Sequence, residues 1–556
     1  MLQELFQQHV PTLEAAIQAV KDRTFYAHWP EPPSGKIYGE HANDDGIRVF
    51  KSALKSSFEL PHQLGAKGSV GEEYSPYGFP LEIQYPAYSV ETLLNNARKA
   101  QHDWQKISLQ HRAAILIECL EKAAAHFFAI GYATMHTTGQ GFIMGFQASG
   151  PHAFDRALES IATGYQAITT FHYDSTWVKP MGKFEVSLYK KFHVRPKGIN
   201  LTIGCSTFPI WNSLPGMFAS LITGNVTIAK AHPNAILPMA LCVQSFQHTL
   251  AKLGIDPHTI QLAVDTKAAP MTIELAKHED VHLIDYTGSS SFGNHLEQIV
   301  HGSGKVLFTE KAGVNCVMIS EAENLDAVLD NLAFSISLYS GQMCTAPQNF
   351  FIPKTGVRSG DSVIPFEEVV NRFAERVKGL VTNEKMGPGT LGALHNESVL
   401  ERVKAAASSG LRIVLESHEI LHEGFEKAVA CSPIILLANA DQKDVYEKEW
   451  FGPISFIIPV ENFEDGINRM ASSVKKHGAL SGAVYTKHED ELSYAEDQLV
   501  AAGCPVAFNL IGPIWVNQSA AFSDFHGTGA NPAGNASFAD LSFITNRYNV
   551  IGTRKA

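Results

Sequence analysis

Residues 281–300, VHLIDYTGSSSFGNHLEQIV, contain the pattern that decides the fold. Apolar residues at the start predict a strand that ends at Tyr286, and the last six residues have a helical pattern. The turn between them is rich in small residues and contains Gly288, Ser289 and Gly293. Backbone N–H groups at the start of a helix suit a pyrophosphate, so these three residues are candidates for cofactor binding. The turn lacks the GxGxxG fingerprint and is a weak signal by itself.

The same alternation of strands and helices extends in both directions from this stretch. Strand-like runs separated by helical segments occur at 199–204, 226–229, 259–264 and 282–286. A second set follows at 314–319, 349–352, 434–438, 454–460 and 480–485. Strands that alternate with helices predict a parallel sheet covered by helices, and the chain is long enough for two such units. The predicted fold class is therefore α/β.

Two kinds of segment depart from this alternation. Residues 1–20 and 90–135 have the three- and four-residue apolar spacing of amphipathic helices. From Phe184 to Val194 apolar and polar residues alternate, which predicts an antiparallel excursion of two or more strands. We therefore expect a helical lead-in before the sheets and a separate β-ribbon.

The composition is that of a globular protein and argues against several partners. The 556 residues are 45% hydrophobic and 18% charged, with a formal net charge of -12. This charge opposes binding to a polyanion, so we expect no nucleic-acid partner. The N-terminus lacks a signal-peptide pattern, and no uncharged apolar run approaches the roughly 20 residues of a membrane span. Seven cysteines without CxxC pairs fit reduced thiols, and we predict a cytoplasmic protein without a membrane partner.

Cys344 is the candidate nucleophile. It lies in SGQMCTAP, residues 340–347, between a helical pattern and the strand predicted at 349–352. Such a connection can present a thiol at a cleft beside backbone N–H groups, which favour the thiolate. A buried structural cysteine is the alternative, and for one cysteine taken alone it is the more common case.

Glu310 is the candidate general base. It follows the strand-like run 305–309 and precedes the small-residue turn Lys311-Ala312-Gly313. A carboxylate in this position is well placed to activate a thiol or a water molecule. A surface glutamate would explain the local pattern equally well.

Other residues are candidates for contact with a nucleotide. Lys230 ends the strand predicted at 226–229, where an ammonium group can meet a phosphate or a ribose. Glu449 and Phe451 lie in EWFGP, residues 449–453, a turn that can hold a ribose or a ring face. A solvated lysine and ordinary turn chemistry are the alternatives for these positions.

Three further motifs are set aside. Residues 278–282 match the zinc signature HExxH, but that motif requires a helix and this stretch begins a strand, so we expect no metal. Residues 302–305 resemble the end of a P-loop, but Ile299 stands where its first glycine should be. The GxG at 527–529 precedes no helical pattern and is predicted to be a loop.

The order and spacing of these motifs resemble the aldehyde dehydrogenase family over roughly residues 90–540. Glu310 stands 34 residues before Cys344, which is the separation between general base and nucleophile in that family. Four more segments resemble family motifs in register: GQMC at 341–344, the run from Phe208-Pro209 through Gly224-Asn225 to Lys230, YTGS at 286–289 and EWFGP at 449–453.

This resemblance implies a Rossmann-type cofactor domain, an α/β catalytic domain and a β-strand oligomerisation arm. The expected ranges are 1–172 and 196–308 for the cofactor domain with its N-terminal extension, 309–535 for the catalytic domain, and 173–195 and 536–556 for the arm. By resemblance, strands at 177–195 and 541–551 pair subunits into a homodimer or a dimer of dimers. The implied reaction is NAD(P)-dependent oxidation of an aldehyde to the acid through a thiohemiacetal and a thioester on Cys344, with Glu310 as general base.

Two positions depart from the family pattern. Thr207 stands where most members have the asparagine that donates to the oxyanion, so we expect Thr207 and the nucleophile's backbone N–H to form this site. Trp211-Asn212 is not expected to substitute, because by register it lies inside the following helix. Pro233 stands where NAD-preferring members have a glutamate. Since Lys230 and His232 would attract a 2′-phosphate, NADP is predicted in preference to NAD.

Within the family, the long N-terminal extension and the segments around Glu310 and Phe208 resemble the phenylacetic acid degradation group, PaaN. This resemblance implies a CoA-linked semialdehyde from aromatic catabolism as the substrate. The nearest alternative is a CoA-acylating dehydrogenase, although the retained Glu310 favours attack by water. A cysteine hydrolase without redox chemistry and a non-catalytic assembly subunit are the remaining alternatives.

Overall fold

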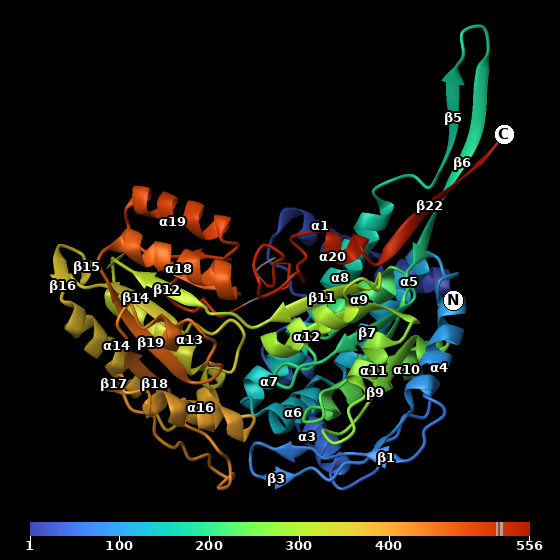
Figure 1. Cartoon of the computed structure of the whole chain (residues 1–556). Coiled ribbons are helices and arrows are strands. Elements are labelled where there is room, and N and C mark those ends of the chain that lie inside the picture. Colours follow the sequence, from blue (N-terminus) through green and yellow to red (C-terminus); the bar gives the residue numbers. More distant parts are fainter. Residues whose placement is uncertain (519–520, 523–525) are drawn as a thin grey trace.

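The chain folds into two α/β lobes, and a long β-ribbon projects from one of them (Figure 1). The structure is a computed structural model and describes residues 1–518, 521–522 and 526–556. The predicted α/β class with parallel sheets is confirmed. Across the described residues, no helix combines the length and the apolar character needed to cross a membrane. All seven cysteines lie in the described part and are free thiols.

The first lobe is built on a five-stranded parallel sheet in the order β11-β10-β7-β8-β9. Its strands are β7 (Ile199–Ile203), β8 (Val226–Lys230), β9 (Ile260–Ala263), β10 (Val281–Gly288) and β11 (Val306–Lys311). The segments between them contain α9 (Leu214–Ile222), α10 (Leu237–Lys252), the 3-10 turn η1 (Pro257–Thr259), α11 (Thr272–Lys277) and α12 (Ser290–Val300). Strands β7, β8 and β9 are buried along their whole length, as expected for a parallel sheet with both faces covered.

The residues before β7 form a helical layer on this lobe. Its helices are α1 (Leu2–Asp22), α2 (Gly35–Tyr38), α3 (Ala42–Ala53), α4 (Val90–Trp104), α5 (Leu109–Ala124), α6 (Phe127–Thr138), α7 (Phe142–Ser149) and α8 (Pro151–Thr169). Two small pairs join β1 (Ser69–Val70) to β4 (Tyr85–Pro86) and β2 (Tyr74–Ser75) to β3 (Phe79–Pro80). Helix α1 buries Phe6 and Leu13 in the same core that contains the strands. The predicted helical lead-in is confirmed, and the N-terminal extension is part of the first lobe's core.

The second lobe is built on a seven-stranded sheet in the order β17-β18-β19-β14-β12-β20-β21. Its strands are β12 (Cys316–Ile319), β14 (Asn349–Pro353), β17 (Arg412–Leu415), β18 (Ile434–Leu437), β19 (Ile454–Val460), β20 (Gly482–Tyr485) and β21 (Ala507–Phe508). Its helices are α13 (Leu325–Ser337), η2 (Leu338–Gly341), α14 (Phe366–Val381), α15 (Gly387–Leu391), α16 (Glu397–Ala407), α17 (Lys443–Tyr446), α18 (Phe463–His477) and α19 (Glu489–Ala501). A side sheet contains β13 (Glu321–Ala322), β15 (Val357–Ser359) and β16 (Ser362–Ile364). The five predicted strands are present, whereas both edge strands and the side sheet were not predicted.

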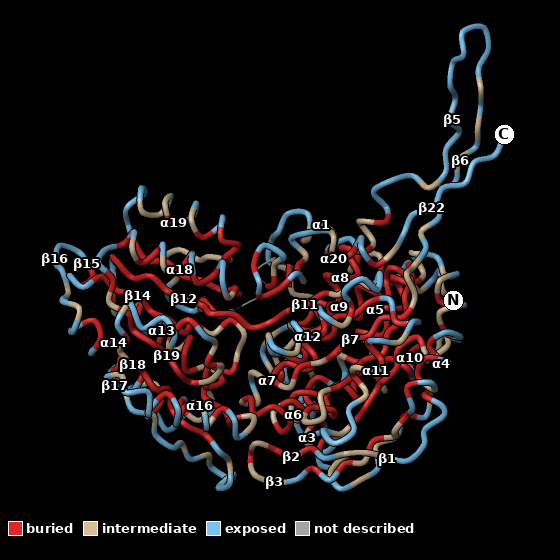
Figure 2. The backbone as a smooth tube through the Cα atoms, in the orientation of Figure 1, coloured by how far each residue is buried: buried red, intermediate tan, exposed pale blue. Residues whose placement is uncertain are grey.

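The ribbon is a three-stranded antiparallel sheet in the order β22-β6-β5. It consists of β5 (Asp174–Pro180), β6 (Glu185–Pro196) and β22 (Tyr548–Lys555), and it is exposed almost throughout (Figure 2). The predicted antiparallel excursion is confirmed. The C-terminal strand predicted at 541–551 instead begins at Tyr548, because α20 (Ser542–Thr545) precedes it and packs Phe543 on Phe308, with ring centres 5.0 Å apart.

Arg547 anchors the ribbon to the first lobe. Its fully buried guanidinium donates to both carboxylate oxygens of Asp285 on β10, at 2.6 and 2.8 Å. It also donates to Ser220 Oγ at 2.7 Å and to the Phe543 carbonyl at 2.8 Å. The strand that follows Arg547 therefore leaves the lobe from a fixed point.

Candidate active site

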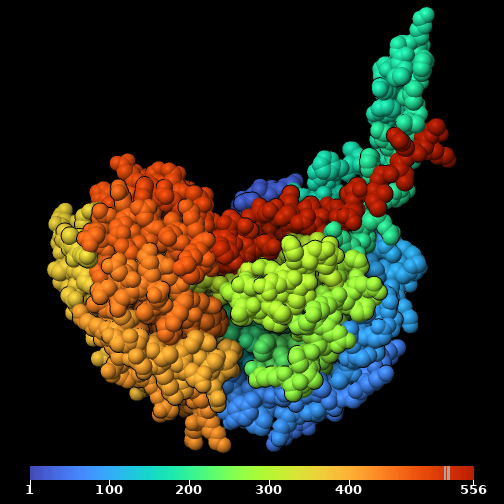
Figure 3. Space-filling view, viewed as in Figure 1, coloured from blue at the N-terminus to red at the C-terminus, as the bar shows by residue number. Residues whose placement is uncertain are grey.

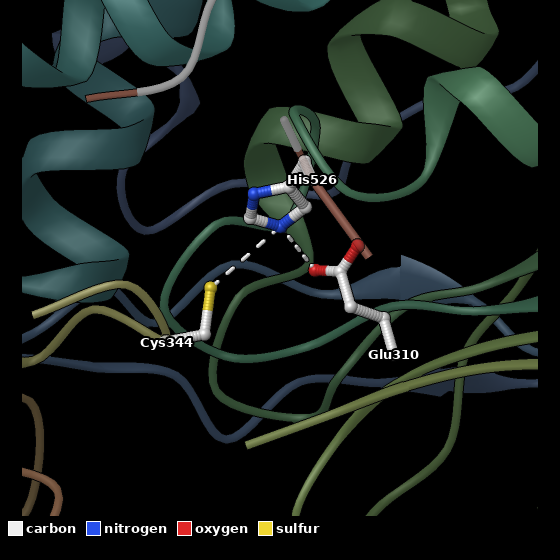
Figure 4. Close-up of side chains that lie close together, drawn as sticks. All are labelled: Glu310, Cys344 and His526. Carbon is white, nitrogen blue, oxygen red and sulfur yellow. Dashed lines mark hydrogen bonds and ion pairs between the residues drawn. The ribbon is translucent and has the colours of Figure 1, made fainter. Parts of the chain in front are cut away.

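Cys344, Glu310 and His526 come together from distant parts of the chain (Figure 4). Glu310 lies on β11 of the first lobe, Cys344 follows η2 in the second lobe, and His526 lies between β21 and α20. His526 Nε2 is 2.6 Å from Glu310 Oε1 and 3.8 Å from Cys344 Sγ. The structure thus brings the two predicted residues together and places an imidazole between them.

The backbone that presents Cys344 is held in an unusual conformation. Tyr339, Ser340 and Gly341 have consecutive positive φ angles of 52°, 50° and 61°. A side chain at Gly341 would come within 2.5 Å of the Gly452 carbonyl oxygen. Tyr339 Oη donates to the Thr138 carbonyl at 2.5 Å, and this contact helps to stabilise the turn. Strained backbone of this kind persists only where its surroundings hold it, as these contacts do.

Asn315 fixes the other side of the same loop. Its Nδ2 donates to the carbonyl oxygens of Cys344 and Ala346 at 2.8 and 2.9 Å. Its Oδ1 accepts from the backbone N–H groups of Leu480 and Ser481 at 2.9 and 3.1 Å. This buried carboxamide joins the nucleophile loop to the residues just before β20, a contact that no local sequence pattern predicts.

The surroundings of Cys344 favour the neutral thiol. Burial raises the pKa of Cys344 well above its ordinary value, and the nearby carboxylates of Glu310 and Glu449 raise it further. Because the thiolate is the nucleophilic form, Cys344 requires a base that removes its proton.

A cavity of about 780 Å³ reaches Cys344 and His526. Its lining is mainly apolar and includes Phe142, Ile143, Phe208, Trp211, Phe334 and Trp515. The rings of Phe334 and Trp515 stack with centres 4.3 Å apart. The described lining contains no lysine or arginine. Its ion pair is Glu31 with His152, whose atoms lie 3.2 Å apart.

Asn212 also lines this cavity, which corrects the expectation that it lies inside a helix. Helix α9 begins at Leu214 with Pro215 in its first turn, and a proline prevents the helical hydrogen bond that an earlier start would require. Asn212 therefore remains in the preceding turn, where Nδ2 donates to Cys205 Sγ at 3.3 Å. Thr207 is buried beside the same sulfur, at 4.0 Å, and is not among the described residues that line the cavity.

The carboxyl end of β10 runs through a glycine turn into helix α12. β10 ends at Gly288, and Ser289 caps α12 by accepting a hydrogen bond from the Phe292 N–H. The helix begins at Ser290, earlier than the predicted His295. A side chain at Gly288 would come within 2.5 Å of Tyr286 Oη. The predicted succession of strand, glycine turn and helix is confirmed, and Figure 3 shows the surface hollowed where the two lobes face each other.

Gly293 lies one turn into α12. It is buried, and the Lys311 side chain packs against it. Lys311 in turn forms an ion pair with Glu297 at 2.7 Å. These contacts hold α12 against β11, so the helix start keeps its position beside the sheet edge.

Lys230 and His232 carry less free positive charge than predicted. Lys230 Nζ lies 2.7 Å from Asp265 Oδ1, and both side chains are buried. Burial and, to a smaller extent, the charge of nearby Lys230 lower the pKa of His232 to about 3, so its imidazole is neutral near pH 7. The attraction for a 2′-phosphate that was expected from this pair is therefore weak.

Glu449 and Phe451 lie in the loop that precedes β19. Burial raises the pKa of Glu449 to about 7, against the opposing charge of Arg402. Arg402 Nε donates to the Phe451 carbonyl at 3.1 Å and so holds the loop. The charge of Glu449 also contributes to the raised pKa values of Cys344 and Tyr286.

The zinc motif at 278–282 is not helical. His278 follows α11 in an extended conformation, and His282 is exposed on β10, as the sequence predicted. Within the described residues, the group whose ligand atoms lie close enough for a metal ion is Glu310, Cys344 and His526, all within 4.8 Å of one another. The absence of a metal remains a prediction.

Comparison with known proteins identifies the family. The model of the aldehyde dehydrogenase family matches residues 84–536. The crystal structure of an NAD-dependent aldehyde dehydrogenase from Burkholderia multivorans is 40% identical, covers 99% of this chain and 98% of its own, and has a TM-score of 0.96. A 1-pyrroline-5-carboxylate dehydrogenase from Thermus thermophilus has the same fold at 17% identity, with 96% and 99% coverage and a TM-score of 0.77.

A curated relative matches over a shorter range. The N-succinylglutamate 5-semialdehyde dehydrogenase of Acinetobacter baylyi is 27% identical over 291 residues, which are 50% of this chain and 55% of that protein. Because the family model matches most of the chain, the chain belongs to the aldehyde dehydrogenase family. The predicted enzyme class and fold are confirmed.

Sequence reasoning missed Asp265 and His526 for different reasons. Asp265 directly follows the strand predicted at 259–264, at the same sheet edge as Lys230, so the argument applied to Lys230 would have found it. His526 precedes the GxG at 527–529, which was interpreted only as a loop. Nothing local indicates that this loop returns to the catalytic centre.

Proposed function

We propose that this enzyme oxidises an apolar aldehyde to the carboxylic acid through a thiohemiacetal and a thioester on Cys344. The observation that carries this proposal is a thiol and a carboxylate bridged by an imidazole at the end of an apolar cavity. A thiolate attacks a carbonyl carbon readily, and the carboxylate is within reach to activate water afterwards.

In the proposed cycle the Cys344 thiol loses its proton and attacks the aldehyde. The Cys344 backbone N–H and Asn212 Nδ2 hold the oxyanion, since Asn212 lines the cavity and Thr207 is buried beside Cys205. NAD(P), when bound, supplies the acceptor for the hydride. Glu310 then takes a proton from the water that hydrolyses the thioester, and the acid leaves.

The residues at the carboxyl edge of the first sheet fit a dinucleotide. The N-terminus of α12 beyond Gly288 suits a pyrophosphate, and Lys230 and Glu449 suit the two riboses. For the choice of cofactor we favour NAD, in contrast to the NADP predicted from Pro233. The buried Asp265 carboxylate beside Lys230 would repel a 2′-phosphate.

The cavity favours an aromatic or branched aliphatic aldehyde. A CoA-linked semialdehyde, which the resemblance to the PaaN group implies, carries phosphates that require cationic partners. Because the described lining has no lysine or arginine, only the aldehyde end of such a molecule would enter. The free aldehyde and its CoA-linked counterpart are therefore the two substrates to compare.

Reduction of the nicotinamide, followed by absorbance, tests this function. Wild type should reduce NAD with the free aromatic aldehyde, and Cys344→Ala should not. Cys242→Ala is the matched control, because this cysteine is buried on α10 away from the cavity. Ester hydrolysis without nicotinamide would favour the hydrolase, and an acyl-CoA product would favour the acylating enzyme.

The ribbon is the proposed contact between subunits. Its exposed apolar side chains include Trp177, Phe184, Val550 and Ile551. Exposed strand edges of this kind tend to pair with another chain, so we expect a homodimer or a dimer of dimers. Light scattering coupled to gel filtration measures the number of subunits.

A further inference from the structure

His526 reaches the catalytic centre through a turn that requires glycine. Gly527 has a φ of 70°, and a side chain there would collide with the Ala536 carbonyl oxygen. The chain then runs antiparallel to β11, with hydrogen bonds from the Lys311 N–H to the Ala533 carbonyl at 2.6 Å and from the Asn535 N–H to the Thr309 carbonyl at 2.9 Å. This pairing fixes the start of the turn beside Glu310, so the position of His526 is built into the backbone.

The groups around the His526 ring are few. Its Nε2 faces Glu310 and Cys344, and the ring meets Trp211 edge to face with centres 4.4 Å apart. The Arg156 guanidinium lies over the Trp211 ring at 4.0 Å. Of the charged and titratable groups described here, Glu310 and Cys344 touch the imidazole directly. Arg156 acts from beyond Trp211, and Glu449 and Cys205 act on the thiol.

Glu310 alone is poorly suited to ionise Cys344. Transfer of the thiol proton to Glu310 leaves a buried thiolate. The nearby charge of Glu449 opposes the formation of that thiolate. An imidazolium between Cys344 Sγ and Glu310 Oε1 changes this arrangement, because the thiolate and the carboxylate then each face a cation. The distances of 3.8 Å to the sulfur and 2.6 Å to the oxygen allow both contacts at once.

We propose that His526 is a catalytic residue that takes the Cys344 proton and passes it to Glu310, a role that rests on the proposed function. The S–H bond of Cys344 breaks, and an N–H bond forms at Nε2. The thiolate then attacks the aldehyde, whose hydride leaves to the nicotinamide. The Nε2–H bond breaks as Glu310 Oε1 takes the proton and releases it to solvent, so one proton is released for each hydride transferred.

Two further features support this route. Nδ1 of His526 is buried and has no partner among the described residues, so proton exchange at this imidazole is confined to Nε2, which faces both the sulfur and the carboxylate. A separate cavity of about 30 Å³ touches Glu310 and Arg156 and has room for one water. Such a water would give the proton an acceptor beyond Glu310.

The test is the reactivity of the Cys344 thiol in His526→Gln. Glutamine keeps a donor for Glu310 but cannot carry a proton at neutral pH. Alkylation of Cys344 by iodoacetamide, measured across a pH series without cofactor, should begin at higher pH than in wild type. The first turnover of NADH formation should slow by about 100-fold or more, the usual contribution of a general base. His248→Gln, an exposed histidine on α10, should behave as wild type.

His526→Ala provides a second measurement if the glutamine variant folds poorly. Added imidazole should restore part of its first-turnover rate, and circular dichroism should match wild type. An unchanged alkylation profile in His526→Gln, or lost activity in His526→Ala without rescue, would overturn the relay. Wild type whose thiol reacts only after a chelator is added would also overturn it, because the three side chains would then hold a metal. If Cys344→Ala still reduces NAD, the proposed function itself fails, and this outcome is distinct from the others.

Discussion

Replacing Arg547 by methionine should loosen the ribbon and destabilise the first lobe. The guanidinium is fully buried and satisfies the Asp285 carboxylate, whose side chain is 9% exposed. Methionine has a similar length but cannot donate a hydrogen bond. The carboxylate on β10 would therefore be left buried without its cation.

The size of the effect follows from this unpaired charge. Removing one partner of a buried ion pair costs about 3–5 kcal/mol. In a large cooperative unit, 1 kcal/mol corresponds to about 2 °C in Tm. We therefore expect Arg547→Met to lower the Tm of the first lobe by about 6–10 °C. The double variant Asp285→Leu/Arg547→Met lacks both charges and should recover at least half of this loss.

Scanning calorimetry of wild type, Asp285→Leu, Arg547→Met and the double variant measures the coupling between the two residues. A fall of less than about 2 °C in Arg547→Met would refute the cost assigned to the buried charge. Equal and additive losses in the two single variants would refute the pairing as its cause. Asp285→Asn is a useful further comparison, because it keeps the shape of the side chain and leaves the arginine unpaired.

Three other predictions concern the cofactor and the cavity. Glu449 has a pKa raised to about 7 by burial, so protonation below pH 7 removes an acceptor for a ribose hydroxyl. NAD affinity should weaken as the pH falls through 7 in wild type and stay flat in Glu449→Gln, as fluorescence titration would reveal. Asp265→Asn should raise kcat/KM for NADP by about tenfold, because one repulsive charge near a phosphate is worth about 1–2 kcal/mol; an unchanged ratio of NADP to NAD would contradict this. Trp515→Ala should raise KM for an aromatic aldehyde by about tenfold or more through lost ring contact, while a short aliphatic aldehyde keeps its KM; equal losses for both would argue against Trp515 as a binding surface.

The buried strands could be predicted from the sequence because their pattern is local. The run 454–460 is apolar and β-branched, and β19 has these same bounds. The edge strand β17 is short and half exposed, and β21 has two residues, so neither contains enough apolar sequence for detection. Local patterns therefore find the centre of a sheet more readily than its edges.

The site could be predicted where it depends on spacing along the chain and not where it depends on tertiary contacts. Cys344 and Glu310 follow from motif distance, whereas His526 is 182 residues from Cys344 and meets it only after the C-terminal segment pairs with β11. Asn212 was misplaced because its register was extended into the helix without regard to Pro215. In each case the missing information lies in contacts between segments far apart in sequence.

Glu31 lines the cavity from a part of the chain that precedes the family match, which begins at residue 84. Its partner His152 lies on α8, so the pair joins the N-terminal segment to the wall of the cavity. Neither side chain is hydrogen-bonded to Cys344 or Glu310 in the described residues. A substitution at Glu31 would therefore change what the cavity accepts and leave the nucleophile and the base in place.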